Sequence, residues 1–431
     1  MPDSRLAPLQ AEHIEHLQSA YADILSQQGY DAVLISSGAA PMRYADDQAH
    51  HHHGYGHFLH WVGLSDVEHS WLLVEKDGRV RLWLHTPVDF WHAVTPVPNE
   101  GWTRLIEVTG QAGIEAPDIP YPDRLAVIGD PTQIQSAPGD ANPPSLLAAL
   151  DNLRVIKTAY EVACMDQASA IAARGHNAAR DAFMAGASEF DINLAYQQAT
   201  GQRETRAPYH SIIGLNEHAG TLHYQHYDSL TPRRPRSLLI DAGARYRGYC
   251  SDITRTTAAP GENRFGALIA GLESLQKRLC DAVAPGVDYI ELHQRAHRGL
   301  AALLKASELV QDIDDDAMVA KGITRAFFPH GLGHFLGIQV HDVAGKPRPA
   351  PEHAPFLRLT HSLKPGMVVT IEPGLYFIPS LLDPLLDSAD GQYLNRSLID
   401  ELRGCGGIRI EDNVLVTEAG ARNLTRTHLP V

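Results

Sequence analysis

The chain has 431 residues, and 51 Asp and Glu against 36 Lys and Arg give it a formal net charge of −15. Apolar residues make up 44% of the sequence and charged residues 20%, a balance typical of folded globular proteins and unlike that of long disordered chains. At about 100 to 200 residues per domain, this length predicts two or three domains. An acidic chain without a Lys/Arg block repels phosphate backbones, so we expect no nucleic-acid partner.

The sequence disfavours two further classes of protein, membrane-spanning and secreted. No apolar run approaches the roughly 18 residues that a membrane span needs, and Met1–Gln10 lacks the basic start and apolar core of a signal peptide. We therefore expect no membrane partner and a cytoplasmic location. The four cysteines lie far apart and form no CxxC pair, which predicts free thiols in a reducing compartment.

The first segment reads as a helix followed by strands. Ile14, Leu17, Tyr21 and Ile24 recur at helical spacing, and Gly29 is expected to end that helix. Four later apolar runs have strand character: residues 31–36, 71–75, 80–84 and 125–128. Lys76-Asp77-Gly78 lies between two of these runs and is a hairpin signal. Together they predict an α/β domain over residues 1–156.

The remainder, residues 157–431, is predicted to be a second domain of α+β order. Thr158 and Glu161 form a capping box at the start of a helix, and Ser188 with Asp191 repeats this chemistry. Strand pairs follow, then a helix over about 288–306, then strands to the end. The tract His50–His53 is biased in composition, but adjacent histidines in a loop cannot all face one ion, so we expect an exposed loop of unassigned purpose.

Acidic residues interrupt two neighbouring apolar runs. Asp241 ends the run 237–241, and Asp252 follows a polar bend. If a hairpin turns at Tyr246 and Arg247, the two carboxylates lie opposite each other. Two like charges at so short a distance in a partly buried site require either a cation between them or one shared proton, as in acid proteases. The further acids described next favour the cation.

Two later strands each carry an acid inside an apolar run. Glu372 follows Met367–Ile371, and Glu411 follows Gly407–Ile410. A glutamate in a central strand is rarely buried without a partner. Alternation places Arg409 on the same face as Glu411, where the guanidinium can orient the carboxylate.

A His- and Gly-rich stretch lies between these strands and supplies His330 and His334, with His341 shortly after. Four carboxylates and one imidazole form a hard, oxygen-dominated donor set that suits Mn²⁺ better than a thiolate zinc site, although Co²⁺, Zn²⁺ and Fe²⁺ remain possible. Bridging carboxylates suit two ions about 3.5 to 4 Å apart, with a bound water that loses its proton near neutral pH. The chemistry that this set predicts is hydrolysis.

These motifs resemble a known family. The segments DAGARYRGYCSDITRT, FFPHGLGHFLGIQVHDV, VVTIEPGLYF and GGIRIEDNV are similar to those of the M24 metallopeptidases with the pita-bread fold. Within that family the chain most resembles the bacterial Xaa-Pro dipeptidases, or prolidases, and the related organophosphorus acid anhydrolases. The resemblance implies a pita-bread catalytic domain preceded by an α/β domain like that of creatinase and aminopeptidase P. It also implies a homodimer, of which the residues themselves give no independent sign.

The resemblance implies a role for each matching residue. Asp241 would bind one divalent ion, His334 and Glu372 the other, and Asp252 and Glu411 would bridge, with Glu372 also accepting the proton of the attacking water. Arg409 and Thr254 would support these ligands from behind. The histidines expected to line the substrate site and stabilise the developing oxyanion are His223, His330 and His341. Tyr209 and Tyr289 match pocket tyrosines, for which aromatic packing is an equally good interpretation.

Arg358 matches the arginine that grips the free carboxylate of proline in prolidases. A planar guanidinium can clamp a terminal carboxylate through two hydrogen bonds, whereas a longer peptide presents an amide there. The resemblance therefore implies cleavage of Xaa-Pro dipeptides to a free amino acid and proline. The alternatives are organophosphorus triester or fluoridate hydrolysis, as a side activity, and aminopeptidase P action on longer Xaa-Pro peptides. A metal-free binding module is a further alternative, which the complete ligand set disfavours.

Overall fold

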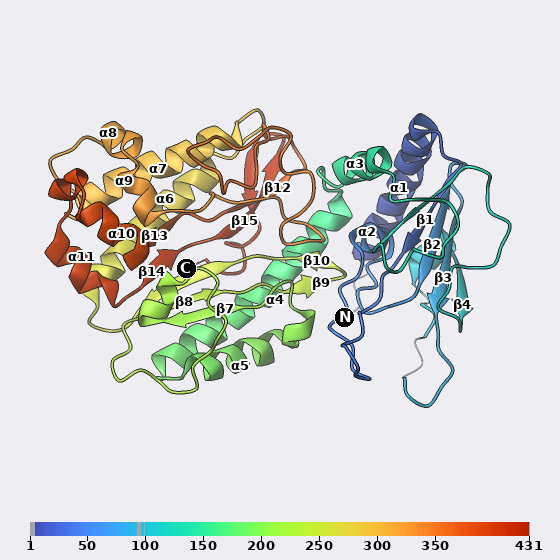
Figure 1. Cartoon of the computed structure of the whole chain (residues 1–431), viewed down its shortest axis with the longest axis horizontal. Helices are drawn as coiled ribbons and strands as arrows, with labels where there is room; N and C mark the ends of the chain where they lie inside the picture. Colours follow the sequence, from blue (N-terminus) through green and yellow to red (C-terminus); the bar gives the residue numbers. More distant parts are fainter. Residues whose placement is uncertain (1–4, 93–95, 99, 431) are drawn as a thin grey trace. The chain divides into compact units, whose positions relative to one another are not determined.

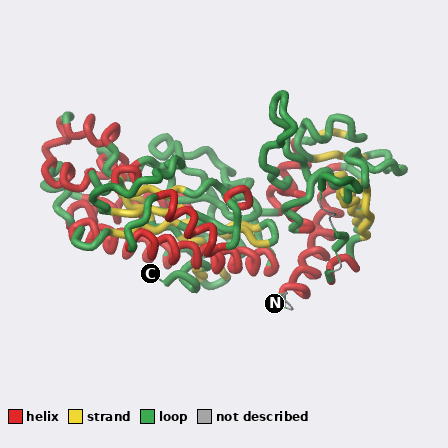
Figure 2. Tube along the Cα trace, turned by 90° about the horizontal axis from the view of Figure 1, so that it is seen from below, coloured by secondary structure: helices red, strands yellow, loops and turns green. Residues whose placement is uncertain are grey.

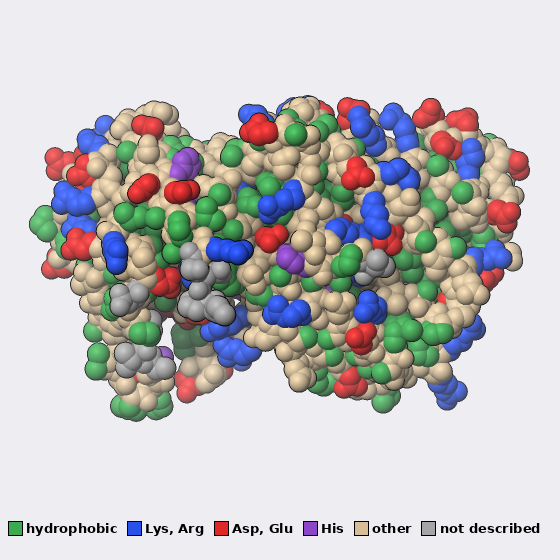
Figure 3. Space-filling view, turned by 180° about the vertical axis from the view of Figure 1, so that it is seen from behind, with side chains coloured by type: hydrophobic (Ala, Val, Ile, Leu, Met, Phe, Trp, Pro, Cys, Tyr) green, Lys and Arg blue, Asp and Glu red, His purple; other side chains and the backbone are tan. Residues whose placement is uncertain are grey.

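The computed structural model describes residues 5–92, 96–98 and 100–430. The chain divides into two compact units, one of residues 1–164 with 247–249 and one of residues 165–246 with 250–431. The boundary predicted between residues 156 and 157 stays a prediction. No helix among the described residues is both long and apolar enough to cross a membrane. On the face shown in Figure 3, Lys and Arg are interspersed with Asp and Glu, as is typical of a globular surface.

The first unit is built on one mixed sheet of six strands in the order β4-β3-β2-β1-β5-β6. Its strands are β1 (Ala32–Ser36), β2 (Trp71–Glu75), β3 (Val80–His85), β4 (Glu107–Gln111), β5 (Leu125–Ile128) and β6 (Asp140–Ala141). The helices are α1 (Leu6–Gln28), α2 (Gly56–Val62) and α3 (Pro144–Leu153), and α1 and α3 lie together beside the sheet (Figure 1). The predicted hairpin is confirmed, because β2 and β3 pair antiparallel.

Two local predictions for this unit have different outcomes. Gly29 caps α1 in the left-handed conformation at φ 76°, as predicted. The predicted apolar face of α1 is confirmed at Ile14, Leu17 and Tyr21, which are buried, but at its end Leu25 is buried and Ile24 only partly so. His50–His53 lies outside any helix or strand, and three of its four side chains are exposed, which confirms the loop.

The second unit has short strands with helices around them (Figures 1 and 2). One sheet has the order β11-β8-β7, another β12-β15-β16, and β13 pairs with β14. The strands are β7 (Ile212–Leu215), β8 (Ser237–Asp241), β11 (Thr254–Ala258), β12 (Val368–Ile371), β13 (Gly374–Tyr376), β14 (Gly407–Arg409), β15 (Asp412–Thr417) and β16 (Gly420–Asn423). The long helices are α4 (Ala159–Met184), α5 (Glu189–Thr200), α6 (Asn263–Asp281) and α7 (Tyr289–Ala306).

The helices of this unit begin as their sequences predict. Thr158 N–H donates to Glu161 Oε2 at 2.8 Å, which confirms the capping box at α4. The Ser188 hydroxyl accepts from Asp191 N–H at the start of α5. Apolar side chains of α4 and α5, among them Phe183 and Ile192, pack on Ile240 of β8. This packing fixes the strand that carries the first predicted metal ligand.

The short helices lie later in the chain and pack on one another. They are α8 (Asp315–Ala320), α9 (Ile323–Phe327), α10 (Pro379–Leu386) and α11 (Arg396–Arg403). Contacts join α7, α8 and α9, and α9 also contacts α10 and β13. The four cysteines are free, as predicted, and they are buried.

Candidate metal centre and substrate cavity

Asp241 and Asp252 come from one antiparallel pairing, but not in the predicted register. Asp241 at the end of β8 faces Thr254 of β11, so Asp252 is not the residue opposite it. The turn is centred one residue later than predicted, at Arg247 and Gly248, with φ of 49° and 88°. Glycine favours that conformation, so it sets the position of a tight turn and shifts the register by two residues.

The other three predicted ligands come from later segments. Glu372 directly follows β12, and Glu411 lies between β14 and β15, where it forms a bridge with Thr254. His334 lies in the glycine-rich segment, where the N–H of Thr370 on β12 donates to the His334 carbonyl at 2.9 Å. The structure therefore brings all five predicted ligands to one place from four separate segments.

Their side chains converge on a common space. His334 Nε2 lies 3.4 Å from Asp252 Oδ2 and 3.6 Å from Glu372 Oε1. One donor atom each of Asp252, His334 and Glu411 lies within 4.8 Å of the others. The Tyr209 hydroxyl is 2.7 Å from Asp241 Oδ1 and 2.5 Å from Asp252 Oδ1, so it can donate to either carboxylate.

The electrostatics of this group call for a cation. Burial raises the pKa of Glu372 to about 7, even though His334 and Arg409 oppose the shift. Burial, together with the neighbouring carboxylates, also raises the pKa of Glu411 far above its usual range. Glu411 Oε1 is buried and has no hydrogen-bond partner among the described residues. A divalent ion among these oxygens would supply that partner and relieve the repulsion, so the residues fit a metal centre.

Arg409 and Thr254 contact two of the predicted ligands, but Arg409 does so by a different connection from the one predicted. Arg409 Nη2 donates to Asp241 Oδ2 at 2.7 Å, so the arginine contacts this aspartate directly. It reaches Glu411 only through Thr254, whose Oγ1 accepts from Arg409 Nε at 3.2 Å and donates to Glu411 Oε2 at 2.8 Å. Both side chains are buried.

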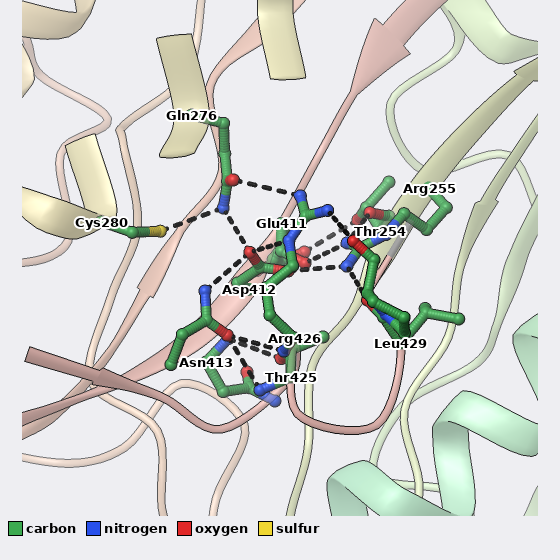
Figure 4. Close-up of polar contacts among 12 residues, drawn as sticks. Thr254, Arg255, Gln276, Cys280, Glu411, Asp412, Asn413, Thr425, Arg426 and Leu429 are labelled. Carbon is green, nitrogen blue, oxygen red and sulfur yellow. Dashed lines mark hydrogen bonds and ion pairs between the residues drawn. The ribbon is translucent and has the colours of Figure 1, made fainter. Parts of the chain in front are cut away.

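A buried ion-pair network lies directly behind Glu411 (Figure 4) and was not predicted. The fully buried carboxylate of Asp412 accepts from Arg255 Nη2 and Arg426 Nε at 2.8 Å each, and from Gln276 at 2.9 Å. Arg255 Nη1 donates to the Glu411 carbonyl at 2.8 Å. The backbone that carries Glu411 is thus tied to β11, α6 and the segment after β16.

A cavity of about 550 Å³ opens over these ligands. The predicted substrate residues that line it are Tyr209, His223, His330, His341 and Arg358. The His341 ring lies edge-on to that of His334, with centroids 4.3 Å apart, and desolvation lowers its pKa to about 3. No hydrogen bond or ion pair of the Arg358 guanidinium is found within the described ranges, so its donors are available to a ligand.

His330 lines the cavity, but both of its ring nitrogens are occupied. Nδ1 is 2.9 Å from the Gly331 carbonyl, and Nε2 is 2.9 Å from the Tyr376 hydroxyl. A proton on Nδ1 satisfies the carbonyl and leaves Nε2 as an acceptor. Tyr376, which receives a bond from Arg409 at 2.7 Å, was missed because a tyrosine in an apolar strand looks like core.

Tyr289 is not where the sequence predicts. It is fully buried, its hydroxyl donates to the Thr370 carbonyl at 2.6 Å, and it does not belong to the cavity lining. The reason is its place as the first residue of α7, whose apolar face packs against the core. Aromatic packing is therefore the correct interpretation for Tyr289, and the prediction of a substrate contact is wrong.

The chain is similar to known proteins over nearly its whole length. Residues 163–418 match the profile of metallopeptidase family M24, and residues 8–152 match the Xaa-Pro dipeptidase N-terminal domain. A Xaa-Pro dipeptidase of Marinobacter nauticus is 64% identical over 426 residues, 99% of each chain. That of Edwardsiella ictaluri is 43% identical over 435 residues, 98% of each.

Solved structures share the fold at low sequence identity. Pseudomonas aeruginosa aminopeptidase PepP aligns with a TM-score of 0.71 and 22% identity, covering 100% of this chain and 96% of its own. A variant of Escherichia coli aminopeptidase P aligns with a TM-score of 0.72 and 20% identity. The alignment covers 97% of this chain and 95% of that one. Together with the two matched domains, these likenesses confirm the predicted α/β N-terminal domain followed by a pita-bread domain.

Proposed function

Because the chain belongs to metallopeptidase family M24, we propose that it hydrolyses Xaa-Pro dipeptides at a dinuclear metal centre, releasing a free amino acid and proline. The observation that carries the proposal is the pairing of a complete ligand set with an unengaged arginine in one cavity. The relatives named Xaa-Pro dipeptidase support the substrate class, since they align over nearly the whole chain.

Five side chains would hold the metal. Asp241 would hold one ion, His334 and Glu372 would hold the other, and Asp252 and Glu411 would be shared between them. When bound, two divalent ions polarise the scissile carbonyl and lower the pKa of a bound water. The oxygen-rich donor set favours Mn²⁺.

The proton steps are assigned to the chain's own residues. Glu372 accepts the proton of the attacking water and delivers it to the prolyl nitrogen as the peptide bond breaks. His341 and His223 donate hydrogen bonds to the substrate carbonyl as its oxygen gains charge. His330 is proposed to shape the cavity wall, because Tyr376 and the Gly331 carbonyl already occupy its nitrogens.

Arg358 would select dipeptides. Its guanidinium can pair with the terminal carboxylate of proline through two charge-assisted hydrogen bonds. A longer peptide places an amide there and leaves the arginine unpaired, at a cost of a few kcal/mol. A homodimer in the cytoplasm completes the proposal, on the grounds of the family resemblance alone.

The test uses purified protein stripped of metal, reloaded with Mn²⁺ and given Leu-Pro or Leu-Pro-Gly. We expect Leu-Pro to be cleaved at the higher kcat/KM and Leu-Gly, which lacks proline, to be cleaved poorly. Preference for Leu-Pro-Gly would overturn the dipeptidase proposal in favour of aminopeptidase activity. No cleavage of either peptide, in protein that binds two Mn²⁺, would overturn the peptidase proposal altogether.

A further inference from the structure

A second cavity, separate from the metal centre, lies between α7, the α8–α9 segment and the loop near residue 353. Its volume is about 310 Å³. Most of its polar lining consists of possible hydrogen-bond donors: His293, His297, Arg298, Thr324, Arg325 and His353. No Asp or Glu is among the described residues that line it. Nothing in the proposed peptidase mechanism uses this cavity.

Two buried histidines of α7 contribute to the wall. His293 and His297 are four residues apart, so they lie on the same face of the helix, and they are 2% and 6% exposed. His297 Nδ1 is held by the Thr324 hydroxyl at 3.0 Å. His293 Nδ1 has no hydrogen-bond partner among the described residues, and no bond of its Nε2 is found there either. An unpaired buried imidazole costs free energy that a ligand can recover.

The rim of the cavity is positive. Arg298 and Arg325 are exposed, and His353 is exposed beside them. Arg298 Nε lies 3.6 Å from Asp316 Oδ1, a loose pair in which both side chains are more than half exposed. No ion pair of Arg325 is found within the described ranges. Pairs this exposed are weak, so both guanidinium groups can turn toward a ligand.

We propose that this cavity binds a small tetrahedral oxyanion, such as the phosphate group of a phosphorylated small molecule. The two arginines would supply the charge. His293 and one member of the His297–Thr324 pair would supply neutral donors from the wall, because the hydrogen bond between those two uses one of their two protons. Two histidines at this spacing can also chelate a transition metal, but the arginines would repel a cation. The proposal concerns binding and stands whatever substrate the metal centre cleaves.

The protonation states of His293 and His297 agree with their role as neutral donors. Burial lowers the pKa of His293 to about 4, and burial, with His293 and Arg325 nearby, lowers that of His297 to about 3. Both imidazoles are therefore neutral at neutral pH, and each has one N–H to donate. The cavity also adjoins the peptidase site, because the Phe328 ring lies 5.0 Å from His297 and 4.8 Å from His330.

The first experiment is calorimetric titration of sodium phosphate into the Mn²⁺-loaded protein at constant ionic strength set with chloride. The test variant is the double substitution Arg298→Gln/Arg325→Gln. The matched control is Arg295→Gln on the same helix, whose side chain pairs with Glu291 and is not part of the cavity lining. We expect wild type and control to bind one more phosphate per chain than the double variant, or to bind that phosphate at least tenfold more tightly. Phosphate bound at the metal centre would remain in all three proteins.

Equal isotherms for the three proteins, or no binding to wild type, would overturn the proposal. Tighter binding of acetate than of phosphate would overturn the choice of a tetrahedral anion. If the double variant does not fold, wild-type crystals soaked in selenate test the site instead. An anomalous selenium peak beside His297 and Arg325 supports the site, and a peak at the metal centre alone refutes it. A transition metal on His293 and His297 after soaking would refute it as well.

Discussion

The Thr254 hydroxyl donates to Glu411 Oε2 at 2.8 Å while it accepts from Arg409 Nε at 3.2 Å. Arginine has only donors and an ionised carboxylate only acceptors, so the direction of both bonds is fixed and the threonine proton goes to the glutamate. Through this one hydroxyl, the arginine that holds Asp241 also orients Glu411.

Thr254→Val keeps the shape of the side chain and removes that hydroxyl. We expect the affinity for Mn²⁺ to fall by about 10- to 100-fold, the usual cost of losing a group that orients a metal ligand. Thr254→Ser is the control, because it keeps the donor. Calorimetry on metal-free protein measures both, and equal affinities for Val and Ser would contradict the role of the hydroxyl.

Glu411→Ala and His341→Ala should separate metal binding from rate. Glu411→Ala removes a proposed ligand, so we expect fewer than two Mn²⁺ per chain by elemental analysis, together with loss of Leu-Pro cleavage. His341→Ala should keep both ions and lose kcat, because its ring contacts His334 from the cavity side. Full metal content in Glu411→Ala would refute its role as a ligand.

Arg358→Ala should affect only substrates with a free terminal carboxylate. We expect kcat/KM for Leu-Pro to fall by about 100-fold, the equivalent of the charge-assisted hydrogen bonds that are lost. Leu-Pro-amide has no carboxylate, so its slower cleavage should change little. An equal loss on both substrates would show that the substitution acts through the structure of the cavity.

Asp412→Asn should destabilise the protein through the network behind Glu411. The substitution leaves Arg255 and Arg426 without their shared buried counter-charge, and breaking a buried pair costs about 3 to 5 kcal/mol. Asp387→Asn is the control, since its pair with Arg396 is mostly exposed and worth less than about 1 kcal/mol. Urea unfolding of metal-free protein measures both, and similar losses would contradict the importance of burial.

His176 predicts a loss of stability in mild acid. Burial lowers its folded pKa from 6.5 to about 4, and its Nε2–H donates to the Ala242 carbonyl at 3.0 Å. The unfolded chain therefore takes up the proton first, so stability falls as the pH drops from 6.5 toward 4. Proton linkage at this group lowers the free energy of unfolding by about 2 kcal/mol between pH 7.5 and pH 5. Unfolding of metal-free His176→Gln should show a dependence on pH weaker by that amount, and an unchanged dependence would contradict the assignment.

The convergence of the acidic residues could be predicted because acids inside apolar strands are conspicuous in a sequence. Asp241, Glu372 and Glu411 each end or follow a run of buried residues, and burial without a partner is costly. The helix starts were equally visible, since capping depends on residues three positions apart, as at Thr158 and Glu161.

Other features depend on distant contacts that local patterns do not contain. The register of Asp241 depends on a turn whose centre is set by backbone conformation at Arg247 and Gly248. Tyr376 and Asp412 look like ordinary strand residues, and only the folded chain shows the arginines that they meet. Tyr289 was misplaced because its side chain is turned toward Thr370 by the packing of α7.

The distance along the chain between ligands has a consequence for biosynthesis. Asp241 and Asp252 are translated well before Glu411, which lies 159 residues beyond Asp252, and Arg409 arrives with the glutamate. Until the segment that carries Arg409 and Glu411 emerges from the ribosome, the two aspartates lack both the arginine and the fifth proposed ligand. Under the proposed ligand assignment, ion capture is therefore a late event in maturation.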